Sequence, residues 1–295
     1  MTLSAASRIL AYRSSRVAAA VLMAIGAAAL LAPVCAIALG VHADVPDLAL
    51  RRCHSGWPHV LGCDDVGQDL MLRMLYGARV SLFVGFASAA LSSLLGLMIG
   101  VLAGAAGGRI DALLMRIVDA MLAIPVLPLL LLASAMAIGK SPAGASTSAI
   151  ELALLLALFG WMGVARIARA ETMRTRQLDF VVAARALGAR AHHVLALHVL
   201  PSVLPSVLVA MTLEVGRGIL AEAALSFLGL GVQPPTPSWG NMLRHAEDAL
   251  HSDPRLAFWP GSAILLTVTC VYVVGGALRR ALDPREGSPP KRALR

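Results

Sequence analysis

The chain has 295 residues, of which 58% are hydrophobic and only 14% are charged, and its mean hydropathy is +0.77. A soluble globular domain does not need such an apolar excess, so the composition indicates a membrane protein. The formal net charge is +8, but basic residues form no stripe and are not interleaved with aromatic ones, so we expect no nucleic-acid partner. The apolar stretches are continuous and lack the alternation typical of barrel strands.

Six stretches are long enough to cross a bilayer as helices, which takes about 20 apolar residues each. The third stretch contains Pro125 and Pro128, and we expect a single kinked span there, because neighbouring helices can satisfy the carbonyls that a proline frees. The sequence therefore predicts an all-α polytopic membrane protein with about six transmembrane helices and lipid around them. The spans cover residues 17–41, 80–104, 115–139, 148–168, 202–225 and 259–279.

The first span has two interpretations. Three arginines precede it, and Val41-His42-Ala43 resembles a signal-peptidase site. A cleavable signal usually has an apolar region of about 7–15 residues, and this one is longer, so we expect a retained anchor. Cleavage would instead leave five spans and put the new N-terminus outside.

The distribution of basic residues predicts the orientation. With both termini in the cytoplasm, the cytoplasmic segments hold 17 of the 25 Lys and Arg residues. Such an excess is typical of cytoplasmic loops. We therefore expect both termini, and the polar insert between the fourth and fifth spans, on the cytoplasmic side.

That insert runs from residue 178 to 201 and reads LDFVVAARALGARAHHVLALHVLP. Its pattern predicts a helix that stops at Gly188, then a second helix that ends at Pro201, because glycine suits a left-handed helix end and proline cannot continue a helix interior. The first helix carries an apolar patch of small residues where a partner can come close, so the insert is either a docking hairpin or an ordinary amphipathic loop. The patch consists of Val181, Ala183, Ala184 and Leu187.

The insert resembles the cytoplasmic EAA loop of ABC importer permeases, which grips the ATPase subunit. The shared pattern is Ala-Ala-x-x-x-Gly followed, after nine residues, by x-x-Leu-Pro. The resemblance implies that the ATPase-coupling loop uses Val182, Ala183, Ala184, Gly188, Leu200 and Pro201. The family's glutamate falls at Val182. Asp179 could compensate, the ATPase could present an apolar surface, or the permease could be weakly coupled or inactive.

Two further segments carry the same resemblance. Residues 59–82, HVLGCDDVGQDLMLRMLYGARVSL, are similar to the LGTDxxGRD and SRLIYGARxSL motifs of the peptide and nickel branch, with Cys63 in place of threonine and Gln68 in place of arginine. Residues 221–240, AEAALSFLGLGVQPPTPSWG, are similar to the signature of C-type subunits of dipeptide and oligopeptide permeases.

The resemblance implies a type I ABC importer permease fold. It divides the chain into an N-terminal stub, first helix and external loop (1–76), a transmembrane domain of five helices (77–280) and a cytoplasmic tail (281–295). The implied function is translocation of di- and oligopeptides across the bacterial inner membrane. The alternatives are a nickel or other small-solute importer of the same kind, and a stand-alone secondary transporter, which would have no use for a docking hairpin.

The implied partners are a homologous permease in a heterodimer, two cytoplasmic ATPases and an external substrate-binding protein. The chain itself should then be no enzyme and bind no cofactor, with ATP and Mg²⁺ used by the partner ATPases. Gly139-Lys140-Ser141 is the nearest approach to a phosphate loop, but Ser134 stands where the upstream glycine must be.

Charges inside the spans are costly and therefore informative. Glu214 and Arg217 lie three residues apart in the fifth span and share a helix face, so they can pair. They either border the translocation path or form a structural pair that faces the partner subunit. Asp119 lies in the third span beside Arg116, where we expect a role in packing or gate support.

Two of the four cysteines, Cys53 and Cys63, lie in the predicted external loop, where an oxidising compartment permits a disulfide. The residues left three alternatives open: a disulfide, two free thiols, or a metal site with nearby His54 and His59. No ligand spacing matches a standard metal site, so we expect none.

Overall fold

The computed structural model describes residues 12–41, 43, 45–138, 145–247 and 249–282. Apart from one isolated bridge between Cys63 and Asp69, the regular structure in these residues is helical. The phosphate-loop-like residues, His42 of the signal-peptidase-like site and the tail from residue 283 lie outside them. The elements are α2 (Arg13–Leu39), η1 (Leu48–Leu50), α3 (Leu70–Ala106), α4 (Gly108–Leu122), α5 (Val126–Ile138), α6 (Ala145–Thr175), α7 (Asp179–Ala186), α8 (Ala191–Val194), η2 (Leu195–Val199), α9 (Leu200–Phe227), α10 (Trp239–Glu247) and α11 (Arg255–Leu282).

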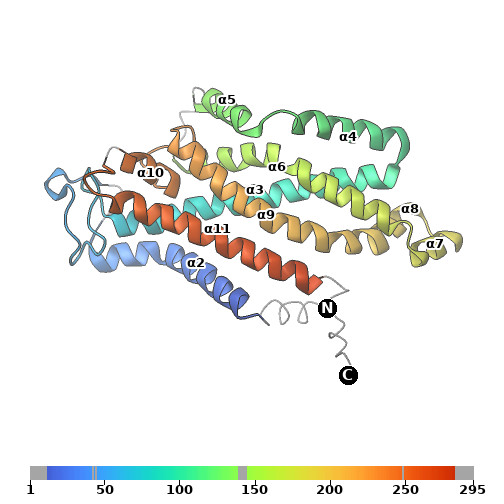
Figure 1. Ribbon diagram of the computed structural model, residues 1–295, viewed down its shortest axis with the longest axis horizontal. Helices are drawn as coiled ribbons and strands as arrows, with labels where there is room; N and C mark the ends of the chain where they lie inside the picture. The colour runs from blue at the N-terminus through green and yellow to red at the C-terminus, as the bar shows by residue number, and fades with distance from the viewer. Residues whose placement is uncertain (1–11, 42, 44, 139–144, 248, 283–295) are drawn as a thin grey trace, which may run out of the picture.

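Five helices of this set are long and apolar enough to cross a membrane, and the bent pair α4 and α5 makes up to six. The prediction of an all-helical membrane protein with about six spans is therefore confirmed. The long helices lie side by side along the longest axis of the molecule (Figure 1). Residues 45–69 and α10 lie at one end, which we call the loop end. The hairpin of α7 and α8 lies at the other, the hairpin end, and the start of α2 and the end of α11 point toward that end (Figure 1).

The third predicted span is interrupted near its prolines, as expected, but the bend is sharper than a kink within one helix. The chain forms two separate helices there, α4 and α5, bent by 82° at a short break. Pro125 is the last residue of the break. It has no N–H to donate to the preceding turn, and its ring disfavours a helical conformation at Ile124, so α4 ends at Leu122. Pro128 lies in the first turn of α5, where a missing N–H costs nothing.

The closest packing in the bundle joins α3 to α6. Gly96, Gly100 and Gly104 recur every four residues on one face of α3 and meet α6 without side chains between the backbones. A methyl group at Gly96 would lie 2.6 Å from Val164 Cβ, and one at Gly104 would lie 2.8 Å from Thr172 Cβ. Because lipid gives helices no hydrophobic reason to associate, this close van der Waals contact holds the pair together.

Arg79 of α3 attaches α2 to the rest of the bundle. Pro33 interrupts α2 and leaves the carbonyl of Ala29, four residues earlier, without its helical donor. The Arg79 guanidinium donates through Nε to the Ala29 oxygen and through Nη2 to the Leu30 oxygen at 2.6 Å. The guanidinium of Arg79 therefore supplies the donor that the carbonyl freed by Pro33 lacks.

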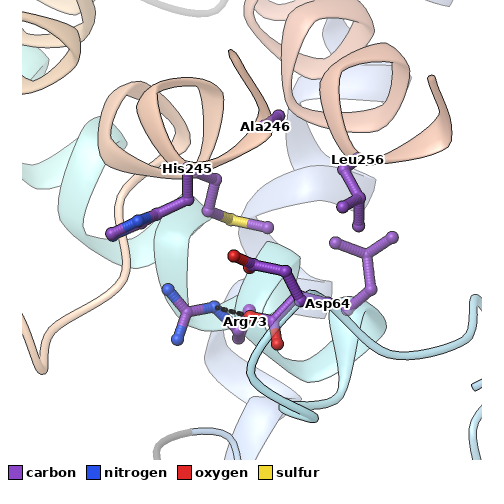
Figure 2. Close-up of a pocket in the computed structure, with 8 residues that line it drawn as sticks. Asp64, Arg73, His245, Ala246 and Leu256 are labelled. Atoms are coloured by element: carbon purple, nitrogen blue, oxygen red, sulfur yellow. Dashed lines mark ion pairs between the residues drawn. The ribbon is translucent and has the colours of Figure 1, made fainter. Parts of the chain in front are cut away.

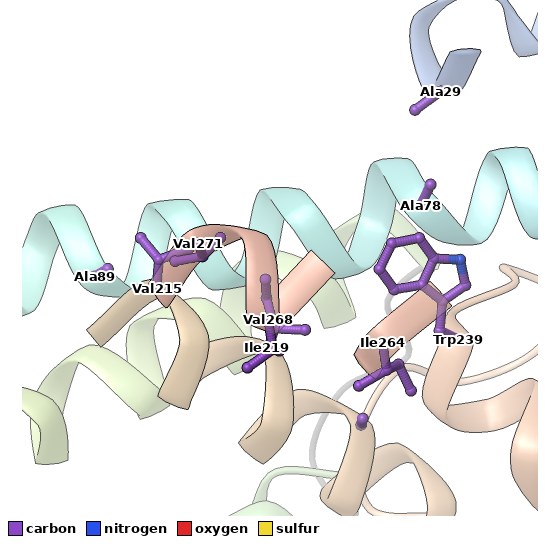
Figure 3. Packing of buried hydrophobic residues seen from close by; sticks show 10 residues of the cluster. Ala29, Ala78, Ala89, Val215, Ile219, Trp239, Ile264, Val268 and Val271 are labelled. Carbon is purple, nitrogen blue, oxygen red and sulfur yellow. The ribbon is translucent and has the colours of Figure 1, made fainter. Parts of the chain in front are cut away.

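The main core lies toward the loop end, where Trp239 at the start of α10 packs against α3. Its indole Nε1 donates to the Met74 carbonyl at 3.1 Å. Figure 3 shows Trp239 next to Ala78, with Ala29 of α2 on the opposite side of α3. The buried cluster consists of Ala29, Ala78, Ala89, Val215, Ile219, Ala223, Trp239, Ile264, Val268 and Val271.

We predict that Gly100→Ala destabilises the bundle by about 1–3 kcal/mol, because the added methyl would lie 2.7 Å from Ala168 Cβ and force α3 and α6 apart. Thermal unfolding in detergent, followed by tryptophan fluorescence, measures the effect. Gly163→Ala in α6 is the matched control, since nothing lies within 4 Å of its added methyl. Equal unfolding temperatures for the two variants would contradict the proposed seam.

Candidate functional site

The hairpin between α6 and α9 consists of α7, a glycine turn and α8. Gly188 has φ 85°, a left-handed conformation that strains other residues, and nothing lies within 4 Å of where its side chain would be. The backbone N–H of Ala189 donates to the Ala184 carbonyl at 3.1 Å and closes the turn. The predicted glycine turn is therefore present, and it lies free at the tip of the hairpin.

One side of the hairpin is fixed to the bundle. Val181 of α7 and Val194 of α8 are buried in a cluster that includes Val164 of α6 and Val203 of α9, and Ala184 packs against it. The predicted patch is thus divided, because Val181 and Ala184 face inward. At the base of the hairpin, Arg176 Nη1 donates to the Gly104 carbonyl at 2.6 Å and ties the end of α6 to the end of α3.

The other side of the hairpin is exposed and apolar. Val182 is 53% exposed and Leu187 is 88% exposed, and Ala183 lies between them on the surface. Exposed Arg185 and Arg190 follow in the chain. An apolar surface with basic neighbours, held rigidly from behind, is suited to contact with another protein.

Pro201 does not end the second helix, contrary to the prediction. The chain is helical without a break from Ala191 to Phe227. Residues 195–199 form a π-helical turn in which the Leu200 N–H bonds to the Leu195 carbonyl, five residues back. This wider turn makes room for the proline ring, and Ser202 Oγ donates to the His198 carbonyl at 2.8 Å. Leu200 is half-buried against the cluster behind the hairpin, and Pro201 is exposed.

Glu214 and Arg217 pair in the middle of α9. Arg217 Nη1 donates to Glu214 Oε1 at 2.7 Å, and the side chains are 66% and 11% exposed, respectively. Glu214 points back toward α6, since a methyl group at Gly160 would lie 3.6 Å from its Oε2. The arginine therefore projects from the bundle while the glutamate lies in it.

A second charged contact involves Asp119, for which the sequence predicts packing or gate support. Asp119 of α4 pairs with Arg166 of α6 at 2.5 Å. Asp111, two turns earlier, accepts two hydrogen bonds from Arg169, at 2.5 and 2.7 Å. These pairs attach α4 to α6.

At the loop end, residues 63–69 are organised by their acidic side chains. Asp64 Oδ1 accepts the N–H groups of Val66 and Gln68, at 3.0 and 2.8 Å. Asp69 accepts the Leu72 N–H at 2.7 Å and so caps α3. Its other oxygen contacts His59 Nδ1 at 2.9 Å. The acidic motif thus starts α3 and shapes the loop before it.

Figure 2 shows a small pocket between this loop, α10 and α11, with Asp64 and Arg73 facing His245 and Leu256. Arg73 Nε lies 3.5 Å from Asp64 Oδ2, and its guanidinium also donates to Gln68. Burial raises the pKa of the Asp64 carboxyl, against the lowering effects of its backbone hydrogen bonds and of Arg73. The cavity has room for about one water molecule, so it is a packing feature and cannot hold a peptide.

Cys53 and Cys63 form a disulfide across this loop. Ligand atoms of both cysteines and of His59 lie within 4.8 Å of one another. The disulfide leaves neither sulfur as a thiolate, so in this state only His59 could serve a metal.

Glu222 received no role from the sequence, although it is a carboxylate inside an apolar span. It is fully buried in α9. Its oxygens accept the hydroxyls of Ser81 in α3 and of Ser226 one turn on, each at 2.8 Å, and Ser81 Oγ accepts the Trp239 N–H at 3.2 Å. Glu222 therefore joins α3, α9 and α10.

Residues 96–287 match the family described as "Binding-protein-dependent transport system inner membrane component". The oligopeptide transport system permease protein OppC of Bacillus subtilis is 39% identical over 227 residues, which cover 77% of this chain and 72% of that protein. A Brucella abortus protein named for a peptide transport system permease is 38% identical over 281 residues, covering 95% and 90%. A Brucella ovis protein named for a peptide permease is 39% identical over 242 residues, covering 81% and 77%.

We predict that Glu222→Leu destabilises the protein by about 1–3 kcal/mol, because it leaves the buried hydroxyls of Ser81 and Ser226 without their acceptor. Glu222→Gln keeps one oxygen and should cost less. Unfolding temperatures in detergent measure both, with Glu247→Gln, at an exposed position of α10, as the control. A Glu222→Leu variant as stable as this control would show that the network contributes nothing.

We predict that Cys53 and Cys63 resist alkylation in the unfolded, unreduced protein and react after reduction, because only the reduced thiols are nucleophilic. Mass spectrometry of the labelled peptides counts the sites. Cys35 and Cys270, which are free, should react with or without reductant and are the internal control. Four labelled cysteines before reduction would contradict the disulfide.

Proposed function

Because the chain belongs to the family of binding-protein-dependent transport system inner membrane components, we propose that it is the permease subunit of an ATP-driven importer of di- and oligopeptides. The placement of the α7–α8 hairpin is the observation that supports coupling to an ATPase. The hairpin projects from one end of the bundle (Figure 1), and one of its sides is packed against the bundle while the other is exposed. The peptide cargo is supported by the names of the similar proteins.

The hairpin is the part that an ATPase subunit moves. Val182, Ala183 and Leu187 make the contact, while Val181 and Ala184 transmit displacement into the bundle. The second half of the hairpin is continuous with α9, from Ala191 to Phe227. A helix is stiff along its axis, so movement at the hairpin reaches the membrane-embedded part of α9 directly.

The apolar contact also accounts for Val182 in place of the family's glutamate. An exposed valine beside an exposed leucine favours an ATPase surface that is apolar at this point. This is the second of the alternatives that the sequence left open. Asp179, at the start of α7, is exposed and remains available at the edge of the contact.

The complete importer requires further chains. We assign to it a homologous permease, with which this chain forms a heterodimer, two cytoplasmic ATPases and an external binding protein. ATP and Mg²⁺ belong to the ATPases, so this chain binds no cofactor and catalyses no reaction. The binding protein docks at the loop end, on the side opposite the hairpin.

The sidedness follows from the same assignment. The start of α2 and the end of α11 point toward the hairpin end of the bundle (Figure 1), so an ATPase at the hairpin puts both termini in the cytoplasm. The hydrogen bonds from Arg79 to α2 favour its retention as an anchor. We keep the division into residues 1–76, 77–280 and 281–295, although α3 begins at Leu70.

Proteoliposomes that hold this chain with its partner permease, ATPases and binding protein test the coupling. We predict that Gly188→Trp abolishes ATP-dependent peptide uptake, because a bulky side chain at φ 85° distorts the exposed tip that the ATPase grips. Uptake of radiolabelled peptide and ATP hydrolysis are measured together.

Gly188→Asn is the matched control, since asparagine tolerates a left-handed conformation and adds little bulk; it should retain most of the uptake. Co-purification of the ATPases separates loss of docking from loss of movement. Uptake in the wild type that needs no ATP and survives Gly188→Trp would mean that the chain works as a solitary transporter.

A further inference from the structure

Arg217 is in a position that the fold of this chain does not explain. It lies in the middle of α9, a helix of mean hydropathy 2.1 over its most apolar window, and its side chain is 66% exposed. A charged side chain at the centre of a membrane-spanning helix costs about 2.5–3.5 kcal/mol on insertion scales when it faces lipid. Arg217 therefore faces either water or another molecule.

The guanidinium has unused hydrogen-bonding capacity. It carries five N–H donors, and among the described residues its only side-chain acceptor is Glu214, reached through Nη1 at 2.7 Å. Glu214 lies back in the bundle, 11% exposed. Glu214 thus neutralises Arg217 and holds it from one side, while the planar fork remains open on the side that points away from the bundle.

The neighbours on the same face of α9 are apolar. Leu213 lies one turn before Arg217 and Leu220 about one turn after it, and they are 43% and 46% exposed. The face therefore offers one cation between two apolar positions. This arrangement suits a short peptide, whose terminal carboxylate can pair with the cation and whose apolar side chains can contact the two leucines.

We propose that Arg217 binds a carboxylate of the peptide as it crosses the membrane, and that Glu214 is a positioning residue that orients the guanidinium. This inference rests on the proposed function in peptide import. A guanidinium pairs with a carboxylate through two parallel hydrogen bonds, which neither lipid tails nor an apolar cargo can form. The pairing with Glu214 also keeps the site from holding its ligand too tightly, because the two carboxylates compete for one cation.

The test compares uptake of a neutral tripeptide with that of the same tripeptide amidated at its C-terminus, with one binding protein in every sample. The ratio of the initial rate for the free tripeptide to that for the amidated tripeptide is measured for the wild type, for Arg217→Gln and for Leu220→Ala. Arg217→Gln should lower the ratio by about tenfold, the usual effect of losing a charge-assisted hydrogen bond. Leu220→Ala alters the same face without touching the charge and should leave the ratio unchanged.

Two further arms identify the source of the carboxylate. An amidated tripeptide with a central aspartate retains one carboxylate in its side chain. If its rate falls in Arg217→Gln as the rate of the free tripeptide does, then Arg217 takes any carboxylate. If its rate does not fall, Arg217 takes the C-terminal carboxylate alone. Arg217→Lys keeps the charge without the planar fork and should retain only part of the discrimination.

A second measurement tests the proposal even if the Arg217→Gln variant does not assemble. Leu213→Cys, in a chain with Cys35 and Cys270 replaced by alanine, is treated with a charged thiol reagent during turnover. The reagent should label residue 213, and peptide should slow the labelling. No labelling would place this face against lipid or protein and would overturn the proposal.

An unchanged ratio of free to amidated rates in an assembled Arg217→Gln variant would also overturn it. A loss of assembly that Arg217→Lys restores, together with an unlabelled Leu213→Cys, would instead assign Arg217 to a carboxylate of the partner permease. Failure of the proposed function has a different signature, since the wild type would then show no ATP-dependent uptake of either peptide.

Discussion

Inside a bilayer no water is available to pair with polar groups, and this constraint decides where the protein can bend and where it can carry charge. Several irregularities of the bundle are compensated by groups of the bundle itself. The carbonyl freed by Pro33 in α2 receives the guanidinium of Arg79 from α3. The ring of Pro201 is accommodated by a π-helical turn. The buried carboxylate of Glu222 accepts two serine hydroxyls. Arg217 is the exception, because its pairing with Glu214 leaves most of its donors free. Glu222 therefore has a structural role, whereas the free donors of Arg217 are available to a ligand.

The same constraint couples the two ends of the molecule. The network around Glu222 fastens α9 to α3 and α10 at the loop end, and the valine cluster fastens α9 and the hairpin to α6 at the hairpin end. Between them α9 is one continuous helix with the Glu214–Arg217 pair near its middle. A displacement of the hairpin by an ATPase would therefore move the charged pair along with the rest of the helix. Hydrolysis in the cytoplasm and access to the pathway would thus share a single mechanical element.

Predictions from neighbouring residues differ from the structure where residues of other helices make contacts that the local sequence does not show. Proline predicts a helix end at residue 201, but a wider turn lets the helix continue, and buried Val199 and Val203 on either side pack against the bundle. Pro125 predicts a kink, but two separate helices form there, and the ion pairs of Asp111 and Asp119 attach the first of them to α6. Asp119 received no ion-pair partner from the sequence, and the structure places Arg166 of α6 opposite it. In each case the outcome depends on which side chain another helix presents.

The sequence by itself determined the features that depend on composition and on neighbouring residues. The length of each apolar stretch sets the number of spans, and Gly188 sets the turn of the hairpin because it adopts a positive φ without strain. Family membership also follows from contiguous motifs. Only the tertiary structure decided which face of α7 is exposed, which helix satisfies Pro33, and that Glu222 is buried while Arg217 is not. Those outcomes depend on contacts between residues far apart in the chain, and no periodicity or spacing along the sequence encodes them.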